Sequence, residues 1–562
     1  MDDNTYYCPK CDRPMVRRQG GKFYGCPAFF PFDEKRNPNG YKAELGQTQC
    51  RGTIRPSYKS APIVRQPRKQ IVGSDQQIAI WEEMKNGDTH IMVKALAGTG
   101  KTTTIEVGSY DMAVPMRAVA FSRKIERELK SRMPERVDVS TFHALGLRII
   151  AAYADKKINV EEGGRKTFKI IESLQIIPVK MKDNEAWQVK KAIAKLVALC
   201  KNRLAEPTKE NLNEMLTRYA VDISVDPSLI LDAVPRVLDV AKTMITVIDM
   251  EDMLWLPIVH NMPFPQVACI LVDEVQDTNP ARTEMIFRCC PTGRIIIVGD
   301  ENQAIMGFTG SDTEAMDNLE KRLSESPRGL TVLGLTKTRR CPKSHVALAQ
   351  SHVPNFEALD DAPEGEIGEY NFVAAVDAIS QGDMVQCRNN APLAKICWKL
   401  LKRHLKVQIA GKRDFGSGLI DLIERMRASD VPQLIERIEE YRGKELAKCE
   451  KMRNAEYASE AINDKCDCLI AFTEGTDSVK ALITLIKTIY ADSDEAGIPK
   501  NAVLLTTTHK AKGLEADTVW ILDPSLYPSK AAKQEWELKQ ENNLIYVRNT
   551  RSKSVLNFIK VD

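Results

Sequence analysis

The chain has 562 residues, of which 43% are hydrophobic and 28% are charged. One hydrophobic core does not organise so long a chain, so we expect roughly two to four domains of ordinary globular composition. No apolar run of about 18 residues is present, and no apolar signal segment follows the N-terminus, which argues against membrane insertion and secretion. We therefore expect a cytoplasmic protein. The fourteen cysteines lie mostly in apolar segments, as is typical of a reducing compartment.

Positive charge is concentrated at the start of the chain. Residues 1 to 73 contain fourteen Lys and Arg against six Asp and Glu, which leaves a net charge of about +8 there and about −4 over the rest. This asymmetry favours a polyanionic partner for the N-terminal region. A basic surface that is merely solvated is the alternative.

Four cysteines in this basic region have the spacing of a metal site. Two lie in Cys8-Pro-Lys-Cys11, and Cys26 and Cys50 follow. Four thiolates form a tetrahedral Zn²⁺ site, and the metal would stabilise a segment whose own core is small. Four unrelated cysteines are the alternative. The segment is similar to the zinc ribbons of bacterial topoisomerase I, with a longer interval before Cys50, and the resemblance implies a C4 ribbon over residues 1–54.

A change of pattern separates this segment from the rest of the chain. Residues 55–72 are basic, carry three prolines and lack apolar periodicity, which predicts an extended linker. Short apolar runs then alternate with helical patterns, which predicts an α/β fold with parallel strands covered by helices. The predicted strands are Ile91–Lys94, Arg117–Phe121, Ala268–Val272, Arg294–Val298, Asp383–Cys387 and Val519–Leu522.

The strands fall into two groups, which predicts two α/β domains. The first covers residues 73–149 and 263–328, and the second covers 329–424 and 499–562. Between these parts, residues 150–262 and 425–498 carry apolar residues every three or four positions, which predicts one helical insertion in each domain. Within the insertions we expect helical segments at Trp187–Leu204 and Glu436–Ile462.

A phosphate-binding loop follows the first predicted strand. Ala95-Leu-Ala-Gly-Thr-Gly-Lys101-Thr102 lies between an apolar strand and a helical pattern, so its N–H groups can hold phosphate. We expect Lys101 on the β- and γ-phosphates of ATP and the Thr102 hydroxyl on Mg²⁺. A chance glycine-rich turn is the alternative. The residues expected to bind the nucleotide are Ala97, Gly98, Thr99, Gly100, Lys101, Thr102 and Thr103.

Two adjacent carboxylates end another predicted strand. Asp273 and Glu274 follow Ile270-Leu-Val, at the edge where a parallel sheet presents residues to a ligand. We expect Asp273 to hold Mg²⁺ and Glu274 to orient and deprotonate the attacking water. A solvated strand end is the alternative, and the Gln-Asp pair that follows makes it less favoured.

These elements and their order resemble the UvrD/Rep helicases of superfamily 1. The segment around Asp273 and Glu274 is similar to their Walker B element, and seven further segments resemble family motifs in the family's own order. The resemblance implies two RecA-like domains, 1A and 2A, with insertions 1B and 2B. These domains close around one shared ATP and open after hydrolysis. The segments are Ser74–Ala79 (Q motif), Phe121–Lys124 (Ia), Thr141–Gly146 (Ib), Val298–Phe308 (III), Leu335–Pro342 (IV), Thr508–Glu515 (V) and Tyr546–Arg551 (VI).

The resemblance implies nucleotide-site residues in both domains. It places Gln76 on the adenine, Gln303 as a sensor of the γ-phosphate and Glu515 at the nucleotide. Arg340 and Arg551 become arginine fingers that the second domain contributes to an ATP bound on the first. A structural ion pair is the alternative for either arginine.

The resemblance also implies a track for one DNA strand, held by aromatic faces and by hydroxyl or cationic groups. For the phenylalanines the alternative is core packing, and for His143 it is a buried, hydrogen-bonded histidine. Motif III departs from the family pattern at Met306 and Thr309, and Arg339 replaces a common aromatic residue in motif IV. The track residues are Phe121, Arg123, Thr141, His143, Phe308, Thr508 and His509.

The implied function is an ATP-dependent DNA helicase that acts on single-stranded and tailed duplex DNA. Lys512 in motif V resembles the branch that moves 3′ to 5′. One alternative is a translocase that strips bound proteins and unwinds poorly, which the short second insertion favours. Another is a nucleotide-gated nucleic-acid-binding module. A protein partner is expected at the zinc ribbon or the second insertion.

Overall fold

The structure is a computed structural model in which the chain divides into two compact units, Met1–Pro67 and Arg68–Asp562. In the part of the chain that it describes, no helix is long and apolar enough to cross a membrane. The ten cysteines there are buried free thiols. The described residues are 71–219, 221, 227–307, 314–410, 413–450, 455–490 and 501–561, together with three short strands near the start of the chain.

The three strands of the first unit form an antiparallel sheet in the order β1-β2-β3. They are β1 (Val16–Arg18), β2 (Phe23–Gly25) and β3 (Thr53–Ile54). Several residues singled out from the sequence lie outside the described residues: Cys8, Cys11, Cys26, Cys50, Phe308 and Thr309.

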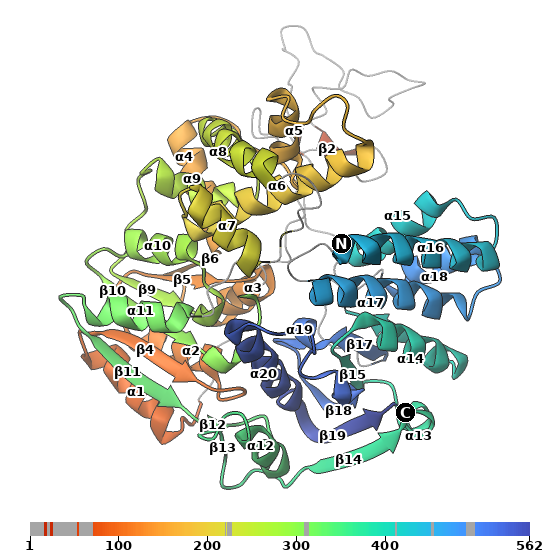
Figure 1. The fold of residues 1–562 in the computed structure, drawn as a ribbon. Helices are drawn as coiled ribbons and strands as arrows, with labels where there is room; N and C mark the ends of the chain where they lie inside the picture. Colours follow the sequence, from red (N-terminus) through yellow and green to blue (C-terminus); the bar gives the residue numbers. More distant parts are fainter. Residues whose placement is uncertain are drawn as a thin grey trace, which may run out of the picture. The chain divides into compact units, whose positions relative to one another are not determined.

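A parallel sheet of six strands forms the centre of a first lobe, residues 71–335 (Figure 1). Its order is β11-β4-β10-β9-β5-β6, and each neighbouring pair is parallel. The four central strands are buried almost throughout, as expected when helices cover both faces of a parallel sheet. The strands are β4 (His90–Ala95), β5 (Met116–Ala120), β6 (Val137–Thr141), β9 (Cys269–Val272), β10 (Arg294–Gly299) and β11 (Leu330–Leu335).

A second parallel sheet, in the order β14-β19-β18-β15-β17-β16, forms the centre of a second lobe, residues 336–561. Two parallel sheets confirm the predicted α/β class. All six predicted strands are present, four in the first sheet and two in the second. The strands of the second sheet are β14 (Glu366–Asn371), β15 (Met384–Cys387), β16 (Val407–Ile409), β17 (Val503–Thr507), β18 (Ala516–Leu522) and β19 (Ser552–Lys560).

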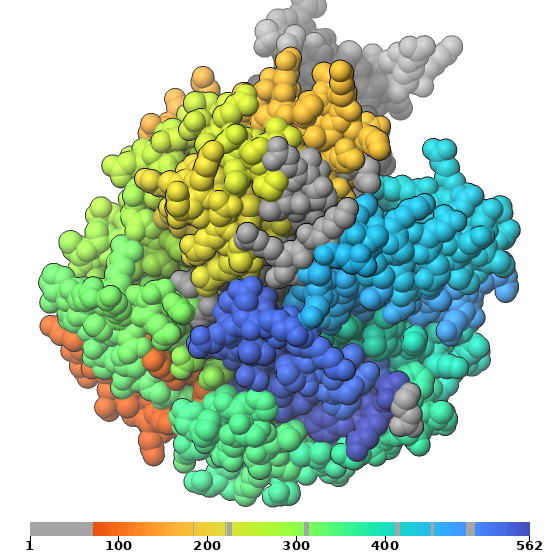
Figure 2. Space-filling view, in the orientation of Figure 1, coloured from red at the N-terminus to blue at the C-terminus, as the bar shows by residue number. Residues whose placement is uncertain are grey.

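Helices cover the sheets, and α20 lies where the lobes meet. Its Leu544 and Val547 pack on Ile305 of the first lobe, and α20 reaches the surface as the dark blue patch in Figure 2. On the first sheet, α1, α2 and α3 pack on one face and α10 and α11 on the other. The helices outside the insertions are α1 (Asp75–Asn86), α2 (Lys101–Asp111), α3 (Arg123–Arg132), α10 (Pro280–Cys289), α11 (Ala315–Ser324), α12 (Lys343–Gln350), α13 (Phe372–Ala378), α14 (Asn390–Lys402), α19 (Thr508–Ala511) and α20 (Glu535–Asn549).

The boundary between the lobes lies later than residue 329, where the sequence placed it. β11 pairs in parallel with β4, with Leu330 opposite His90 and Leu335 opposite Ala95. Residues 330–335 therefore complete the first sheet, and the chain passes to the second lobe after Leu335. An edge strand that is only partly buried lacks the continuous apolar run that marks a central strand.

The first insertion is helical and shares its hydrophobic core with one face of the first sheet. A two-stranded sheet of β7 (Asn159–Val160) and β8 (Val247–Ile248) ties its ends together. The predicted helix at Trp187–Leu204 corresponds to α6. The helices are α4 (Phe142–Ala154), α5 (Arg165–Ser173), α6 (Asp183–Arg203), α7 (Lys209–Arg218), α8 (Pro227–Thr243) and α9 (Asp252–Val259).

Two lysines and two aspartates are buried together in this insertion. The Asp252 carboxylate lies 2.6 Å from the Lys166 ammonium and 2.8 Å from that of Lys201, which also pairs with Asp249 at 2.7 Å. Burial opposes the charge of Lys201, but the carboxylates of Asp252 and Asp249 outweigh it and raise the pKa of this lysine. The cluster joins α5, α6 and the start of α9, so it fixes these helices of the insertion relative to one another.

The second insertion starts earlier than residue 425. One of its segments, which the sequence predicted as a single helix, forms two helices. α15 packs against α16 and α18, so the insertion begins at Arg413. The expected segment Glu436–Ile462 is divided between α16 and α17, which pack on each other. One straight helix cannot pack on itself, so α16 and α17 are separate helices. The helices are α15 (Arg413–Met426), α16 (Val431–Cys449), α17 (Ala455–Thr473) and α18 (Val479–Ile489).

Asp252→Asn is expected to lower the free energy of unfolding by about 3 kcal/mol, because it leaves the buried Lys166 ammonium without its counter-charge and removes one of the two carboxylates of Lys201. Urea unfolding followed by tryptophan fluorescence, to which Trp255 at 5.7 Å from the Lys201 ammonium contributes, measures the loss. The matched control is Asp232→Asn, which breaks an exposed pair with Lys209 in the same insertion and should cost less than about 1 kcal/mol. Equal losses in the two variants would contradict this view of the cluster.

Candidate functional site

The loop from Leu96 to Gly100 joins β4 to the first turn of α2. Gly98 has φ +70° and Gly100 has φ +90°, a left-handed backbone that glycine adopts without strain. A Cβ at Gly98 would lie 2.6 Å from the Cβ of Arg340, which belongs to the second lobe. The missing side chain therefore lets the second lobe approach the loop directly.

The two residues expected to hold Mg²⁺ contact each other. The Thr102 hydroxyl donates to the Asp273 carboxylate at 2.6 Å. Burial and the neighbouring Glu274 carboxylate raise the pKa of Asp273. For Glu274, burial is outweighed by the charges of Lys101 and Lys512, which lower its pKa. The Gln276 amide donates to Glu274 at 2.5 Å and fixes its carboxylate.

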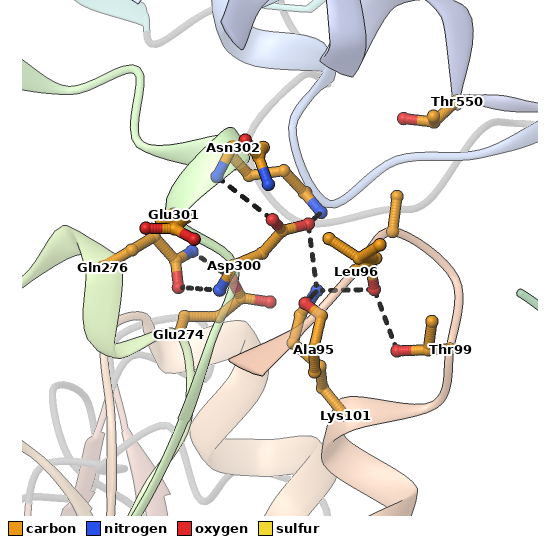
Figure 3. Close-up of polar contacts among 12 residues, drawn as sticks. Ala95, Leu96, Thr99, Lys101, Glu274, Gln276, Asp300, Glu301, Asn302 and Thr550 are labelled. Carbon is orange, nitrogen blue, oxygen red and sulfur yellow. Dashed lines mark hydrogen bonds and ion pairs between the residues drawn. The ribbon is translucent and has the colours of Figure 1, made fainter. Parts of the chain in front are cut away.

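Asp300, which had no role assigned from the sequence, contacts several of these residues. Its buried carboxylate accepts from the Gln303 side chain at 2.5 Å and from the Asn302 N–H at 3.1 Å (Figure 3). The Lys101 ammonium lies 3.9 Å away, and the Asp300 N–H donates to Gln276 at 3.0 Å. Asp300 follows a buried parallel strand, as Asp273 does. Its position at the end of that strand is the sequence signal that could have identified it.

The second lobe contributes two arginines to the same cleft, whose volume is about 1410 Å³. Arg340 donates to the Glu515 carboxylate at 2.6 Å, and Lys553 pairs with the same carboxylate. Arg551 is almost fully buried and donates to the Val547 carbonyl at 2.9 Å. Burial, with a contribution from Arg340, lowers the pKa of Arg551 to about 10. The cleft is also lined by Gly98, Gly100, Lys101, Thr102, Thr103, Glu274 and Gln303.

Several hydrogen bonds cross between the lobes at this cleft. The Ala97 N–H of the loop donates to the Tyr546 hydroxyl at 2.8 Å. The Lys512 ammonium donates to the Asp277 carboxylate at 2.8 Å and to the Gln303 carbonyl at 2.6 Å. These pairs are distant in sequence, so no local pattern identifies them.

The structure places Gln77, rather than Gln76, beside the loop. The Gln76 amide instead pairs with Thr336. The buried Gln77 donates to Thr104 at 3.1 Å, and its amide nitrogen lies near Gly100. Ser74 and Gln77 form a capping box that begins α1, so helix capping decides which glutamine turns inward. Arg339 donates to the side-chain Oε1 of Gln77 at 3.3 Å and lines the cleft.

The residues expected on a DNA strand differ in their exposure. Phe121 and His509 line the cleft, and Arg123 is exposed at the start of α3. Thr508 does not face the cleft, because it is fully buried and hydrogen-bonded to Tyr527. The Thr141 hydroxyl caps α4, and the side chain is buried.

The two histidines of this region are neutral in the folded protein. Burial, with a smaller contribution from Arg282, lowers the pKa of His143 to about 4. Burial also lowers the pKa of His509 to about 3, with contributions from Arg388 and Lys510. Any contact that these side chains make at neutral pH is therefore a hydrogen bond or a stacking contact and not a charge pair.

Thr102 and Asp273 fit a Mg²⁺ site, since both supply oxygen atoms beside the loop. In the part of the chain that the structure describes, no group of three or more His, Cys, Asp and Glu side chains is placed to hold a metal ion. Mg²⁺ usually takes one or two protein oxygens and completes its shell with water and phosphate. The pair therefore fits an ion that arrives with a nucleotide.

Comparison with known proteins gives matches over both lobes. Residues 76–324 match the UvrD/REP helicase N-terminal domain, and residues 385–562 match the UvrD-like helicase C-terminal domain. The F-box DNA helicase protein 1 of Schizosaccharomyces pombe is 25% identical over 264 residues, which cover 45% of this chain and 30% of that protein.

Two bacterial relatives align over longer stretches. The ATP-dependent DNA helicase UvrD1 of Mycobacterium tuberculosis is 24% identical over 366 residues, 57% of this chain and 45% of that protein. The ATP-dependent DNA helicase PcrA of Bacillus subtilis is 22% identical over 618 residues, 84% of this chain and 81% of that protein. The chain thus spans less than half the length of the yeast and mycobacterial relatives.

His143→Gln is expected to reduce the loss of stability on acidification. The unfolded histidine binds a proton below its ordinary pKa of 6.5, whereas folded His143 does so only near 4. The free energy of unfolding therefore falls as the pH drops through this window. Urea unfolding at pH 7 and pH 5 should show a smaller fall for the variant than for the wild type. His404→Gln, at an exposed position, should follow the wild type, and the same fall in all three proteins would refute the assignment.

Proposed function

Because the chain belongs to the UvrD/Rep family of superfamily 1 helicases through both of its lobes, we propose that it is an ATP-dependent DNA helicase. One observation carries the proposal. Lys101 and Glu274 of the first lobe and Arg340 and Arg551 of the second line a single cleft. A nucleotide bound there would contact both lobes, so its hydrolysis would change how the lobes are held together.

The chemistry follows from the positions of these groups. Lys101 lies at the N-terminus of α2, where the loop N–H groups and the helix dipole favour phosphate. With Thr102 and Asp273 as its ligands, Mg²⁺ would offset the charge of the phosphates. Glu274, whose pKa is low and whose carboxylate is fixed by Gln276, is suited to orient and deprotonate the attacking water.

The arginines would act on the charge that develops at the γ-phosphate. Arg340 is held by Glu515 at 2.6 Å beside the loop, so an exchange from carboxylate to phosphate would bring it into the reaction. Gln303 is bonded to Asp300 through its side chain and to Lys512 through its carbonyl. A shift of Gln303 on hydrolysis would therefore reach the second lobe through Lys512.

We assign the DNA track to the cleft residues Phe121 and His509, with His143 nearby, and a direction of movement of 3′ to 5′. The direction rests on the resemblance of motif V, including Lys512, to that branch of the superfamily. A translocase that removes bound proteins and unwinds poorly is the second candidate. The short second insertion, α15 to α18, favours it.

We also propose that Cys8, Cys11, Cys26 and Cys50 form a zinc ribbon that adds DNA affinity or a protein contact. The proposal rests on their spacing in the sequence. The short antiparallel strands β1 to β3, which lie between and after these positions along the chain, support it.

The wild-type chain is expected to displace a strand from a duplex with a 3′ single-stranded tail, in the presence of ATP and Mg²⁺. A duplex with a 5′ tail should remain intact, and Lys101→Ala should abolish both ATP hydrolysis and displacement. A strand-displacement assay on both duplexes measures this. Displacement from the 5′-tailed duplex alone would overturn the polarity. DNA-stimulated hydrolysis without displacement would favour the translocase, and hydrolysis indifferent to DNA would exclude both motors.

The purified full chain is expected to contain one zinc ion, measured by elemental analysis, and Cys8→Ser should lose it. Cys200→Ala, which changes a buried thiol in the first insertion, is the control and should keep its zinc. A wild-type chain without zinc would refute the ribbon. If Cys8→Ser also abolished ATP hydrolysis, the ribbon could not be an independent appendage.

A further inference from the structure

Arg282 lies between the nucleotide site and the proposed strand track. It is in the first turn of α10, where Asn279 caps the helix by accepting the Arg282 N–H at 2.9 Å. Its guanidinium donates to the Asp277 carbonyl at 3.0 Å. The Asp277 carboxylate in turn accepts from Lys512 of the second lobe. One short path therefore runs from this guanidinium to the contact between the lobes.

The same guanidinium lies over an aromatic ring that lines the cleft. Its central carbon is 5.1 Å from the centroid of the Phe121 ring, within the range of a cation–π contact. Phe121 and Phe142 pack in a T-shaped arrangement, with 5.4 Å between ring centroids. Arg282 and Phe142 thus hold the ring, while Phe121 itself is partly exposed and lines the cleft. Because Arg282 occupies one face, a planar group that enters the cleft can stack only on the other.

The Nε of Arg282 is buried at a cost, although part of the side chain is accessible. Among the described residues, its Nε has no hydrogen-bond partner. Burial lowers the pKa of Arg282, and the carboxylates of Asp277 and Glu251 only partly oppose this. A buried N–H donor without a partner is destabilising, and such groups are rare in folded proteins unless they serve a function. No other step proposed for this chain uses Arg282.

We propose that Arg282 is a positioning residue of the strand track, which holds the Phe121 ring so that a nucleobase of single-stranded DNA can stack on its open face. This inference rests on the proposed function. Through the Asp277 carbonyl, Arg282 also connects that stacked base to the Lys512 contact between the lobes. Binding of the strand and closure of the lobes then share one side chain.

A double-mutant cycle on the full chain tests the proposal. The variants are Arg282→Gln, Phe121→Leu and the pair, and the probe is oligo(dT). ATP turnover is measured with and without DNA, to separate the half-saturating DNA concentration from the maximal rate. Arg282→Gln is expected to raise the half-saturating concentration by about tenfold, the scale of one lost base stack. In the Phe121→Leu background the same substitution should add less than about twofold, because its effect acts through the ring.

Arg288→Gln is the matched control. Arg288 is on the same helix, and its guanidinium lies 5.8 Å from the ring of Phe264, a residue outside the cleft lining. Its half-saturating concentration should stay within about twofold of the wild type. Arg282→Lys keeps a charge but loses the planar fork, so it should shift the half-saturating concentration in the same direction. If Arg282→Gln has a lower thermal unfolding temperature than the wild type, Arg282→Lys replaces it in the cycle.

The outcomes separate this inference from the function on which it rests. Wild-type turnover that does not respond to oligo(dT) would refute the proposed function. With a responsive wild type, the role of Arg282 would be refuted if its variants behave like Arg288→Gln. It would also be refuted if the effects of Arg282→Gln and Phe121→Leu simply multiply, or if only the DNA-free rate falls.

Discussion

The Lys512 ammonium connects the two lobes at the point where the chemistry is expected. It bonds to the Asp277 carboxylate and to the Gln303 carbonyl. Asp277 and Gln303 both lie in segments that follow strands of the first sheet. The Gln303 side chain bonds to Asp300, and the Asp277 N–H bonds to the carbonyl of Glu274, next to Asp273. An ammonium that is only about one-tenth exposed is sensitive to displacement of either partner, because it loses charge-assisted hydrogen bonds with no water to replace them. The relative position of the lobes is therefore tied to the geometry of the nucleotide site.

The central strands of the first sheet and the loop were predictable because a single physical rule governs each. Parallel strands buried on both faces are continuous apolar runs, such as Ile295–Val298, and carboxylates at their ends meet at one edge of the sheet. β14 was missed because its largely exposed sequence, Glu-Ile-Gly-Glu-Tyr-Asn, contains no apolar run. Adjacent glutamines could not be distinguished because helix capping, and not composition, turns Gln77 inward. The position of Arg282 depends on contacts with residues more than a hundred positions away, which no local pattern contains.

The second insertion is fixed to its lobe by polar contacts as well as by its core. Asp464 on α17 accepts from the N–H groups of Asn390 and Ala391 at the start of α14, at 3.0 and 2.7 Å. The buried Arg388 pairs with Glu541 on α20 and donates to Tyr457 on α17. Because three helices meet at these contacts, the insertion should move with the second sheet as a single body. Relative motion is then confined to the cleft between the lobes.

The pairing of Arg340 with Glu515 has a thermodynamic consequence for any anion that enters the cleft. A free arginine side chain loses roughly 2 kcal/mol of rotamer entropy when it is immobilised. Here that loss has already occurred on folding, since the carboxylate and the Thr550 carbonyl hold the guanidinium in place. An incoming phosphate therefore competes with a carboxylate for a group that is already ordered. The cleft is built for selectivity between anions, because only a ligand of greater charge than Glu515 can take the arginine from it.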